Sequence, residues 1–403
     1  TEITTLSIAA LLGALLSVWL GLSYGVFTYE EIFSFIDLRI IALIVGTMVV
    51  LEVAYESGLF HLIALYTVRW AGGDLRKFFV IICVTAAGFS MFLSDSTALL
   101  LTAAAIMTAS KHMEFNPIPF IVASAIMTNL GGTSTLIGSV SNMVIGVSAG
   151  LSFMDFISRL LPCELSLWTL TILILYNFYK AELVERKAIP EYNPWESVRN
   201  RPLLAKSTLF LVALLVLLIL QEPLNIRPEA AALGCAILAL ASSRIDPAEI
   251  FRRLDWETIF FLLGFFFIVG GLQEAGVLNY LSETLLQVSG GDPILATVST
   301  LWISGLASTA VSNIAIALTL TPVIQGVHMS HSINLWSALV LGTNLGGAAT
   351  PMSGVVCILA LNALKREGIR VSFGEFSKIG MLTTLTQLGF ATLYLLLMVI
   401  LGV

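Results

Sequence analysis

Charged residues are scarce in this chain. Asp, Glu, Lys and Arg together make up 11% of its 403 residues, whereas a soluble domain carries about 25%. Hydrophobic residues make up 57%, and apolar runs long enough to cross a bilayer recur at 6–26, 160–179, 205–220 and 379–402. The composition excludes a soluble domain and predicts an all-α polytopic membrane protein.

Nucleotide and metal motifs are missing as well. The chain has no G-x-x-x-x-G-K-[ST] loop, so its energy would come from an ion gradient or from a separate partner. Its four cysteines stand apart in apolar segments and lack the spacing of metal ligands. We expect no metal, no cofactor, no nucleic-acid partner and no enzymatic activity. No basic residue precedes the first apolar run, which is interpreted as a transmembrane helix rather than a signal peptide.

What the sequence does contain is an internal repeat. DLRIIALIVGTMVVLEVAYESGLF at 37–60 aligns with DWETIFFLLGFFFIVGGLQEAGVL at 255–278, so that matched residues lie 218 positions apart. Further along, NLGGTST at 129–135 aligns with NLGGAAT at 344–350. We interpret the chain as a duplication. Its parts are a first transmembrane repeat at 1–180, a cytoplasmic linker at 181–205 and a second transmembrane repeat at 206–403.

The basic residues indicate that the two repeats have opposite orientations. The loop at 27–37 has no Lys or Arg, whereas its counterpart at 244–255 has three. After the matched helix the bias reverses, because 69–77 has three basic residues and 287–293 has none. Under the positive-inside rule these equivalent loops lie on opposite sides of the membrane, and the basic linker lies in the cytoplasm. An inverted-topology repeat is typical of secondary transporters, whose binding site lies near the bilayer midplane.

Two segments are too short to cross the membrane twice. In 78–110 and 296–327 each arm has about 15 residues, roughly 23 Å of helix against a core of about 30 Å. They predict two re-entrant hairpins with tips at Ser94–Thr97 and Ser312–Asn313. Two interrupted helices follow, broken within 129–142 and 344–354, and about nine crossings are expected in total. The predicted helix-break glycines are Gly131, Gly132, Gly346 and Gly347.

The tips and breaks would meet near the midplane and form a site. Asp95 is the one carboxylate expected there, and its counterpart in the second repeat is Asn313. An acid can titrate or neutralise a cation, whereas an amide only forms hydrogen bonds, so Asp95 is the predicted coupling-ion site for a proton or Na⁺. A packing seam of small residues is the alternative interpretation of each break. The predicted substrate-binding residues are Ser94, Ser96, Thr97, Asn129, Thr133, Ser134, Thr135, Asn142, Ser312, Asn313, Asn344 and Thr350.

These motifs resemble a known superfamily. The hairpin tips, GGTSTLIGSVSNMVIGVSAGLSFMDF and LGTNLGGAATPMSGVVCILALNALKREGIRVSFGEF are similar to the ion transporters that include ArsB-type arsenite permeases and NhaD-type sodium/proton antiporters. The melanosomal P protein and the citrate and dicarboxylate carriers are more distant relatives. GSVSN at 138–142 departs from the GDPPN of the antiporters, and Asp95 and Asn313 match the ND-type and NN-type tips of the arsenite permeases better.

The resemblance implies an integral, multi-pass protein of a bacterial or archaeal inner membrane. It implies a secondary transporter that exports arsenite or antimonite while protons enter, by alternating access, alone or with a cytoplasmic ATPase subunit. A pocket of hydroxyls and amides without Arg suits the uncharged trihydroxyl form of arsenite. A sodium/proton antiporter and a sodium-coupled dicarboxylate or citrate carrier remain alternatives. A channel or a non-transporting scaffold represents another class, and the oligomeric state stays open.

Overall fold

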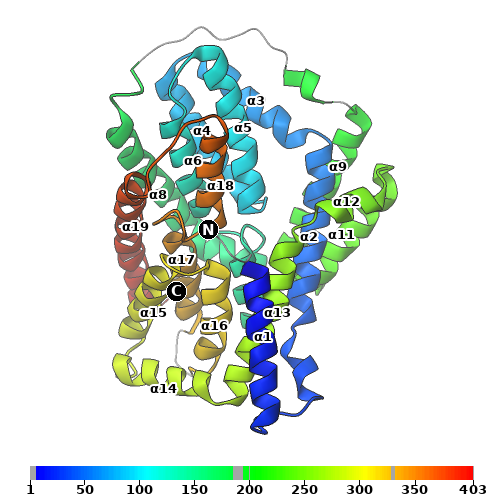
Figure 1. The fold of residues 1–403 in the computed structure, drawn as a ribbon, viewed down its shortest axis with the longest axis vertical. Helices are drawn as coiled ribbons and strands as arrows, with labels where there is room; N and C mark the ends of the chain where they lie inside the picture. Colours follow the sequence, from blue (N-terminus) through cyan, green and yellow to red (C-terminus); the bar gives the residue numbers. More distant parts are fainter. Residues whose placement is uncertain (1–5, 185–193, 199, 328–331, 403) are drawn as a thin grey trace.

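The computed structural model describes residues 6–184, 194–198, 200–327 and 332–402, and every regular element in these ranges is a helix. Six of these helices are long and apolar enough to cross a membrane. The chain is therefore an all-α polytopic membrane protein, as its composition predicts (Figure 1). The six helices are α1 (Leu6–Ser23), α2 (Leu38–Glu56), α8 (Phe153–Tyr179), α9 (Arg201–Ile219), α13 (Trp256–Glu274) and α19 (Phe373–Leu401).

The helices of the two halves begin and end at matched residues. Each pair is shifted by 218 residues: α2 with α13, α3 (Leu59–Ala71) with α14 (Val277–Ser289), and α4 (Leu75–Ser90) with α15 (Pro293–Ser308). The caps explain the agreement, because aspartates at equal positions accept hydrogen bonds from the first backbone N–H groups. Asp37 and Asp255 cap α2 and α13, and Asp74 and Asp292 cap α4 and α15.

Two re-entrant hairpins enter from opposite ends of the molecule. In Figure 1, α4 and α5 (Asp95–Met113) lie in the upper half, and α15 and α16 (Asn313–Gln325) lie in the lower half. The first tip falls at Met91–Ser94, three residues before the predicted Ser94–Thr97. The reason is that Ser94 is the N-cap of α5, where its hydroxyl accepts a hydrogen bond from Thr97 N at 3.4 Å. Ser312 holds the N-cap position of α16.

Two interrupted helices follow the hairpins. One consists of α6 (Ile118–Gly131) and α7 (Val140–Ala149), the other of α17 (Ser332–Gly346) and α18 (Val355–Arg366). A Cβ on Gly131 would overlap the backbone of Ala87, and a Cβ on Gly346 would overlap the backbone of Gly305. Glycine is therefore required where each interrupted helix crosses the first arm of its own hairpin.

Helix α1 and its counterpart in the second half, α11 (Pro228–Ser243), each pack on a long helix of the opposite half. Helix α1 lies along α13, and α11 lies along α2 (Figure 1). Matched glycines permit both crossings. A Cβ on Gly46 would lie 2.7 Å from the Ala232 carbonyl carbon, and a Cβ on Gly264 would lie 2.7 Å from that of Ala10. Small residues at such crossings let helix backbones approach closely.

Helix α9 packs on α11 and α2, and none of the described helices of the first half is its counterpart. Arg253 of α12 (Pro247–Arg253) pairs with Glu52 at 3.7 Å and with Glu56, which ties α12 to α2. Helices α8 and α19 join the halves, because Gln387 Nε2 donates to Thr171 Oγ1 at 2.9 Å. The remaining short elements are η1 (Glu31–Phe35), η2 (Pro194–Ser197) and α10 (Gln221–Leu224).

Candidate functional site

Each hairpin tip is tied to the helix break of its own half. Thr135 Oγ1 donates to the carbonyl of Met91 at 2.5 Å in the first half. At the matched positions of the second half, Thr350 Oγ1 donates to the carbonyl of Thr309 at 3.1 Å. Two of the predicted site hydroxyls thus hold the tips against the breaks.

The two breaks are also joined to each other. Asn344 Nδ2 donates to Asn142 Oδ1 at 2.8 Å, and Asn142 Nδ2 donates to the carbonyls of Gly132 and Thr135, each at 2.8 Å. The second copy of this junction is weaker, because Asn129 Nδ2 faces Cys357 Sγ at 3.8 Å. The structure therefore brings both tips and both breaks into one cluster, as the repeat predicts.

Asp95 stands at the first tip in a position that its counterpart does not reproduce. Ser90 Oγ donates to Asp95 Oδ1 at 2.7 Å, and a Cβ on Gly132 would lie 3.2 Å from the same oxygen. Asn313 Oδ1 accepts instead from the following backbone N–H, that of Ile314, at 2.9 Å. The carboxyl of Asp95 is thus directed at the helix break, whereas the Asn313 amide is directed at its own helix.

The predicted site residues differ in how accessible they are. Asn129, Thr133, Ser134, Thr135, Asn142, Asn344 and the four break glycines are buried. Several of their polar groups are engaged with backbone; Thr133 Oγ1, for example, donates to the carbonyl of Leu130 at 2.7 Å. The other predicted site residues are partly exposed. They are Ser94, Asp95, Ser96, Thr97, Ser312, Asn313 and Thr350.

A cavity of about 340 Å³ lies beside the helices α7 and α16 that follow the first break and the second tip. Its walls come from η1 and α13 on one side and from α7 and α16 on the other, including Val144, Ser148 and Gln325. Asp37 and Arg39 lie in its lining and form an ion pair at 2.6 Å. Burial alone would raise the pKa of the Asp37 carboxyl, but the hydrogen bonds and charge of Arg39 outweigh it and hold that pKa below its usual value.

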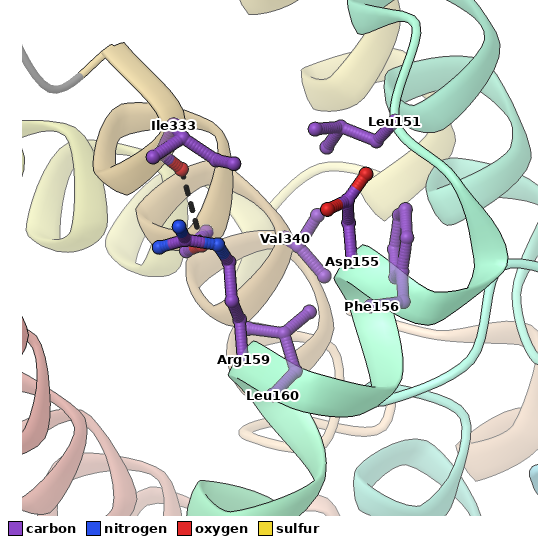
Figure 2. A pocket seen from close by; sticks show the side chains of 8 residues that line it. Leu151, Asp155, Phe156, Arg159, Leu160, Ile333 and Val340 are labelled. Atoms are coloured by element: carbon purple, nitrogen blue, oxygen red, sulfur yellow. Dashed lines mark hydrogen bonds between the residues drawn. The ribbon is translucent and has the colours of Figure 1, made fainter. Parts of the chain in front are cut away.

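A second pocket, between α8 and α17, is far smaller (Figure 2). Its volume of about 10 Å³ holds about one water molecule. Figure 2 shows Asp155 and Arg159 of α8 facing Ile333 and Val340 of α17. Asp155 closes a capping box with Ser152, whose backbone N–H it accepts at 2.8 Å. This pocket is a packing gap and adds nothing to the site.

The fold and the paired helix breaks agree with the comparisons to known proteins. A family described as citrate transporter matches residues 1–342 of the chain. The chain belongs to this citrate transporter family. It is a membrane transporter, and several of its relatives have no established substrate.

Named relatives cover nearly the whole length of this transporter. It is 30% identical to a 46 kDa membrane protein of Mycobacterium leprae over 401 residues, 96% of this chain and 93% of the relative. It is 28% identical to an uncharacterised transporter of Mycobacterium tuberculosis, covering 89% and 86%. It is 27% identical to the arsenical pump membrane protein of Escherichia coli over 348 residues, covering 84% and 81%.

A solved transporter shares its fold. The crystal structure of the YdaH transporter of Alcanivorax borkumensis, described as having an unusual topology, superposes with a TM-score of 0.69 over 99% of both chains. Sequence identity is 11%, so this likeness shows the fold alone. The inverted repeat, the two re-entrant hairpins and the two interrupted helices together define the fold of this transporter.

Sequence reasoning missed one residue of the site region. Glu164 of α8 is fully buried and lies against Ser134 of the first helix break. Its position inside a long apolar run is the signal that could have revealed it, because acidic residues are rare at membrane depth. It has no acidic partner in the repeat, since Thr384 occupies the equivalent position of α19.

Proposed function

We propose that this transporter exports arsenite or antimonite from the cytoplasm while protons enter. The chemistry of the site carries the proposal: hydroxyls, amides, backbone carbonyls and one carboxyl, Asp95, whose hydrogen bond comes from Ser90. The ion pairs formed by described residues lie elsewhere, at Arg39, Lys111 and Arg253. Arsenite is an uncharged trihydroxyl molecule at neutral pH, so it needs hydrogen-bonding groups and no cation.

One relative supports this substrate, because it is named an arsenical pump membrane protein. Asp95 would bind the coupling proton, and the accessible groups of the two tips would bind the substrate. The division into a first repeat at 1–180, a cytoplasmic linker and a second, inverted repeat at 206–403 belongs to this proposal. So do an inner-membrane location and a role in arsenical resistance, with or without a cytoplasmic ATPase subunit.

Alternating access is supported by the 340 Å³ cavity. It lies toward η1, the end of the molecule opposite α3 in Figure 1. Because the loop around η1 has no basic residue while 69–77 has three, this end faces away from the cytoplasm in the proposal. The conformation described here would then be open to the outside, and transport would require the tips and breaks to move against α2 and α13.

Arsenite uptake into everted vesicles under an imposed proton gradient tests the proposal. Wild type and Asp95→Asn are compared with and without Na⁺. We expect proton-driven uptake that is indifferent to Na⁺ and is lost in the variant. Absence of arsenite movement together with sodium-dependent dissipation of the pH gradient would instead establish a sodium/proton antiporter.

A citrate or dicarboxylate carrier is the second candidate, favoured by the description of the matching family. A polycarboxylate would need a cationic partner, and a co-transported Na⁺ bound at Asp95 could supply it. The discriminating measurement is uptake of labelled citrate by right-side-out vesicles with and without a sodium gradient. Sodium-driven citrate uptake with no arsenite transport would show that citrate, and not arsenite, is the substrate.

A further inference from the structure

Glu164 lies deep inside a membrane-spanning helix. It is in α8, 11 residues beyond the first residue, Phe153, of a helix of 27 residues. At 1.5 Å per residue this is about 17 Å along an axis of about 40 Å. Its side chain is fully buried. An acidic residue at this depth and burial indicates a function in ion handling.

The hydrogen bonding of Glu164 is incomplete. One carboxyl oxygen, Oε1, accepts from Trp168 Nε1 at 2.9 Å. The other oxygen, Oε2, and the Ser134 hydroxyl are buried and have no hydrogen bond of standard geometry, although the hydroxyl and the backbone N–H of Ser134 both face the Glu164 carboxyl. Buried polar groups are rarely left without a partner, so a hydrogen bond between these two neighbours is the arrangement they favour. Whether the carboxyl is ionised or protonated then depends on the surrounding charges.

The surroundings offer no compensating cation. Helices α4, α6, α9, α17 and α19 pack on α8, and α6 and α17 carry no titratable residue. On the other three, every Arg and Lys side chain is exposed to the surface. None of the described ion pairs includes Glu164. The titratable residues on these elements are Arg76, Lys77, Cys83, Arg201, Lys206, Glu375, Lys378 and Tyr394, with Asp155, Arg159, Cys163, Tyr176 and Tyr179 on α8 itself.

A buried carboxylate without a cation is far more costly than a neutral acid. A neutral Glu164 carboxyl avoids this cost, and in that state its Oε2–H can donate to Ser134 Oγ. Arg159 does not change this conclusion, since its guanidinium lies in the small pocket against α17 (Figure 2).

The first helix break thus lies between two carboxyl groups. Asp95 of α5 approaches it at Gly132, and Glu164 of α8 approaches it two residues later at Ser134. The second half has no such pair. Asn313 replaces Asp95, and Thr384 replaces Glu164 and donates to the carbonyl of Leu345 at 3.2 Å. Both acids lie at the same helix break. The groups at the other break cannot exchange a proton at physiological pH.

We propose that Glu164 is a second proton-binding site of the transporter, separate from Asp95, and that the Ser134 hydroxyl of the first helix break holds its proton. A rearrangement of the break that withdraws Ser134 leaves the acid without its acceptor and admits water. The proton then passes from Oε2 to water, and the carboxylate is left. The contribution of this proton to coupling rests on the proposed function, whereas its presence on Glu164 does not.

Infrared difference spectroscopy of the reconstituted full chain, acid minus alkaline pH, tests the proposal without any substrate. Asp95 and Glu164 each contribute a carbonyl-stretching band when protonated. We expect two such bands in wild type, of which Glu164→Gln removes one and Asp95→Asn removes the other. Glu283→Gln, on the exposed face of α14, is the matched control and keeps both bands. Ser134→Ala should keep the Glu164 band and shift it to higher frequency, because the acceptor of its proton is lost.

Retention of both bands in Glu164→Gln, or an unshifted band in Ser134→Ala, overturns the inference. If Glu164→Gln does not fold, Ser134→Ala decides alone, because it leaves the carboxyl in place. A Glu164 band in a protein that moves no arsenite would refute the proposed function and support the second proton site. Arsenite transport by a protein without that band would support the proposed function and refute the second proton site.

Discussion

Asn344 Nδ2 donates to Asn142 Oδ1 at 2.8 Å and joins two helix breaks that lie 202 residues apart in the chain. The repeat builds the same junction a second time with Asn129 and Cys357, where the thiol replaces the amide and the distance is 3.8 Å. Because sulfur is a weak acceptor, the two copies differ in strength as well as in chemistry. The site is therefore symmetric in backbone and asymmetric in its polar groups.

This junction predicts a measurable coupling energy. In a double-mutant cycle, Asn142→Ala and Asn344→Ala should interact by about 1 kcal/mol in the free energy of unfolding, since each leaves the partner of a buried hydrogen bond unpaired. Unfolding of the purified protein in detergent provides the measurement. The cycle of Asn129→Ala and Cys357→Ala is the control and should give a smaller interaction. Additive effects for the two asparagines would show that they are not joined.

The difference between the two tips predicts that the acid cannot be moved. Asn313→Asp should fail to restore transport to Asp95→Asn. The side chain at 313 accepts from Ile314 N. Ser308, the counterpart of Ser90, donates to the carbonyl of Thr343 rather than to residue 313. We expect proton-driven uptake on the order of tenfold or more below wild type in the double variant, as in the single one. Uptake by reconstituted vesicles measures it. Recovery of transport would mean that the two positions are equivalent.

The crossings of α1 on α13 and of α11 on α2 predict similar losses of stability when their glycines are replaced. Gly46→Ala and Gly264→Ala should each destabilise the protein by about 1–3 kcal/mol, because the added Cβ meets backbone atoms of α11 or α1 that cannot rotate away. Gly234→Ala is the control, since a Cβ there meets no atom within 4 Å. Helix propensity alone should raise its stability by up to about 1 kcal/mol. The melting temperatures of the three variants are compared, and equal values would contradict the close crossings.

The orientation of the molecule predicts where thiol reagents react. The native cysteines are all buried and should stay unlabelled. Ser148→Cys, in the wall of the large cavity, should react with a membrane-impermeant maleimide from outside intact cells. Lys180→Cys, at the end of α8, should react only in everted vesicles. Labelling of both positions from one side would reverse the proposed sidedness of the linker or of the cavity.

Much of the fold could be predicted from the sequence because the repeat provides two copies of its main elements. The aligned blocks at 37–60 and 255–278 predicted equivalent helices in the two halves, and the paired glycine-rich stretches predicted both breaks. The tip was misplaced by three residues because Ser94, expected at the apex, caps the second arm. The partner of α1 was not readable at all. Gly46 and Gly264 indicate a close crossing, but a glycine does not reveal which helix approaches it.

The site was less predictable, because hydroxyl direction depends on tertiary contacts. Thr133, Ser134 and Thr135 are adjacent in sequence, yet two donate to backbone carbonyls and Ser134 lies against α8. Glu164 was missed for a related reason. The search for site residues followed the hairpin tips and helix breaks, whereas Glu164 lies in the middle of the long helix α8 and reaches the first break only through tertiary packing.

The exchange of first helices also determines the order in which the protein can be assembled. Helix α1 is synthesised well before its packing partner α13, which begins at Trp256. Until α13 is synthesised, the face of α1 that packs on it is exposed to lipid. Helix α1 thus enters the membrane long before it can reach its native neighbour, so its insertion and its packing are separated in time.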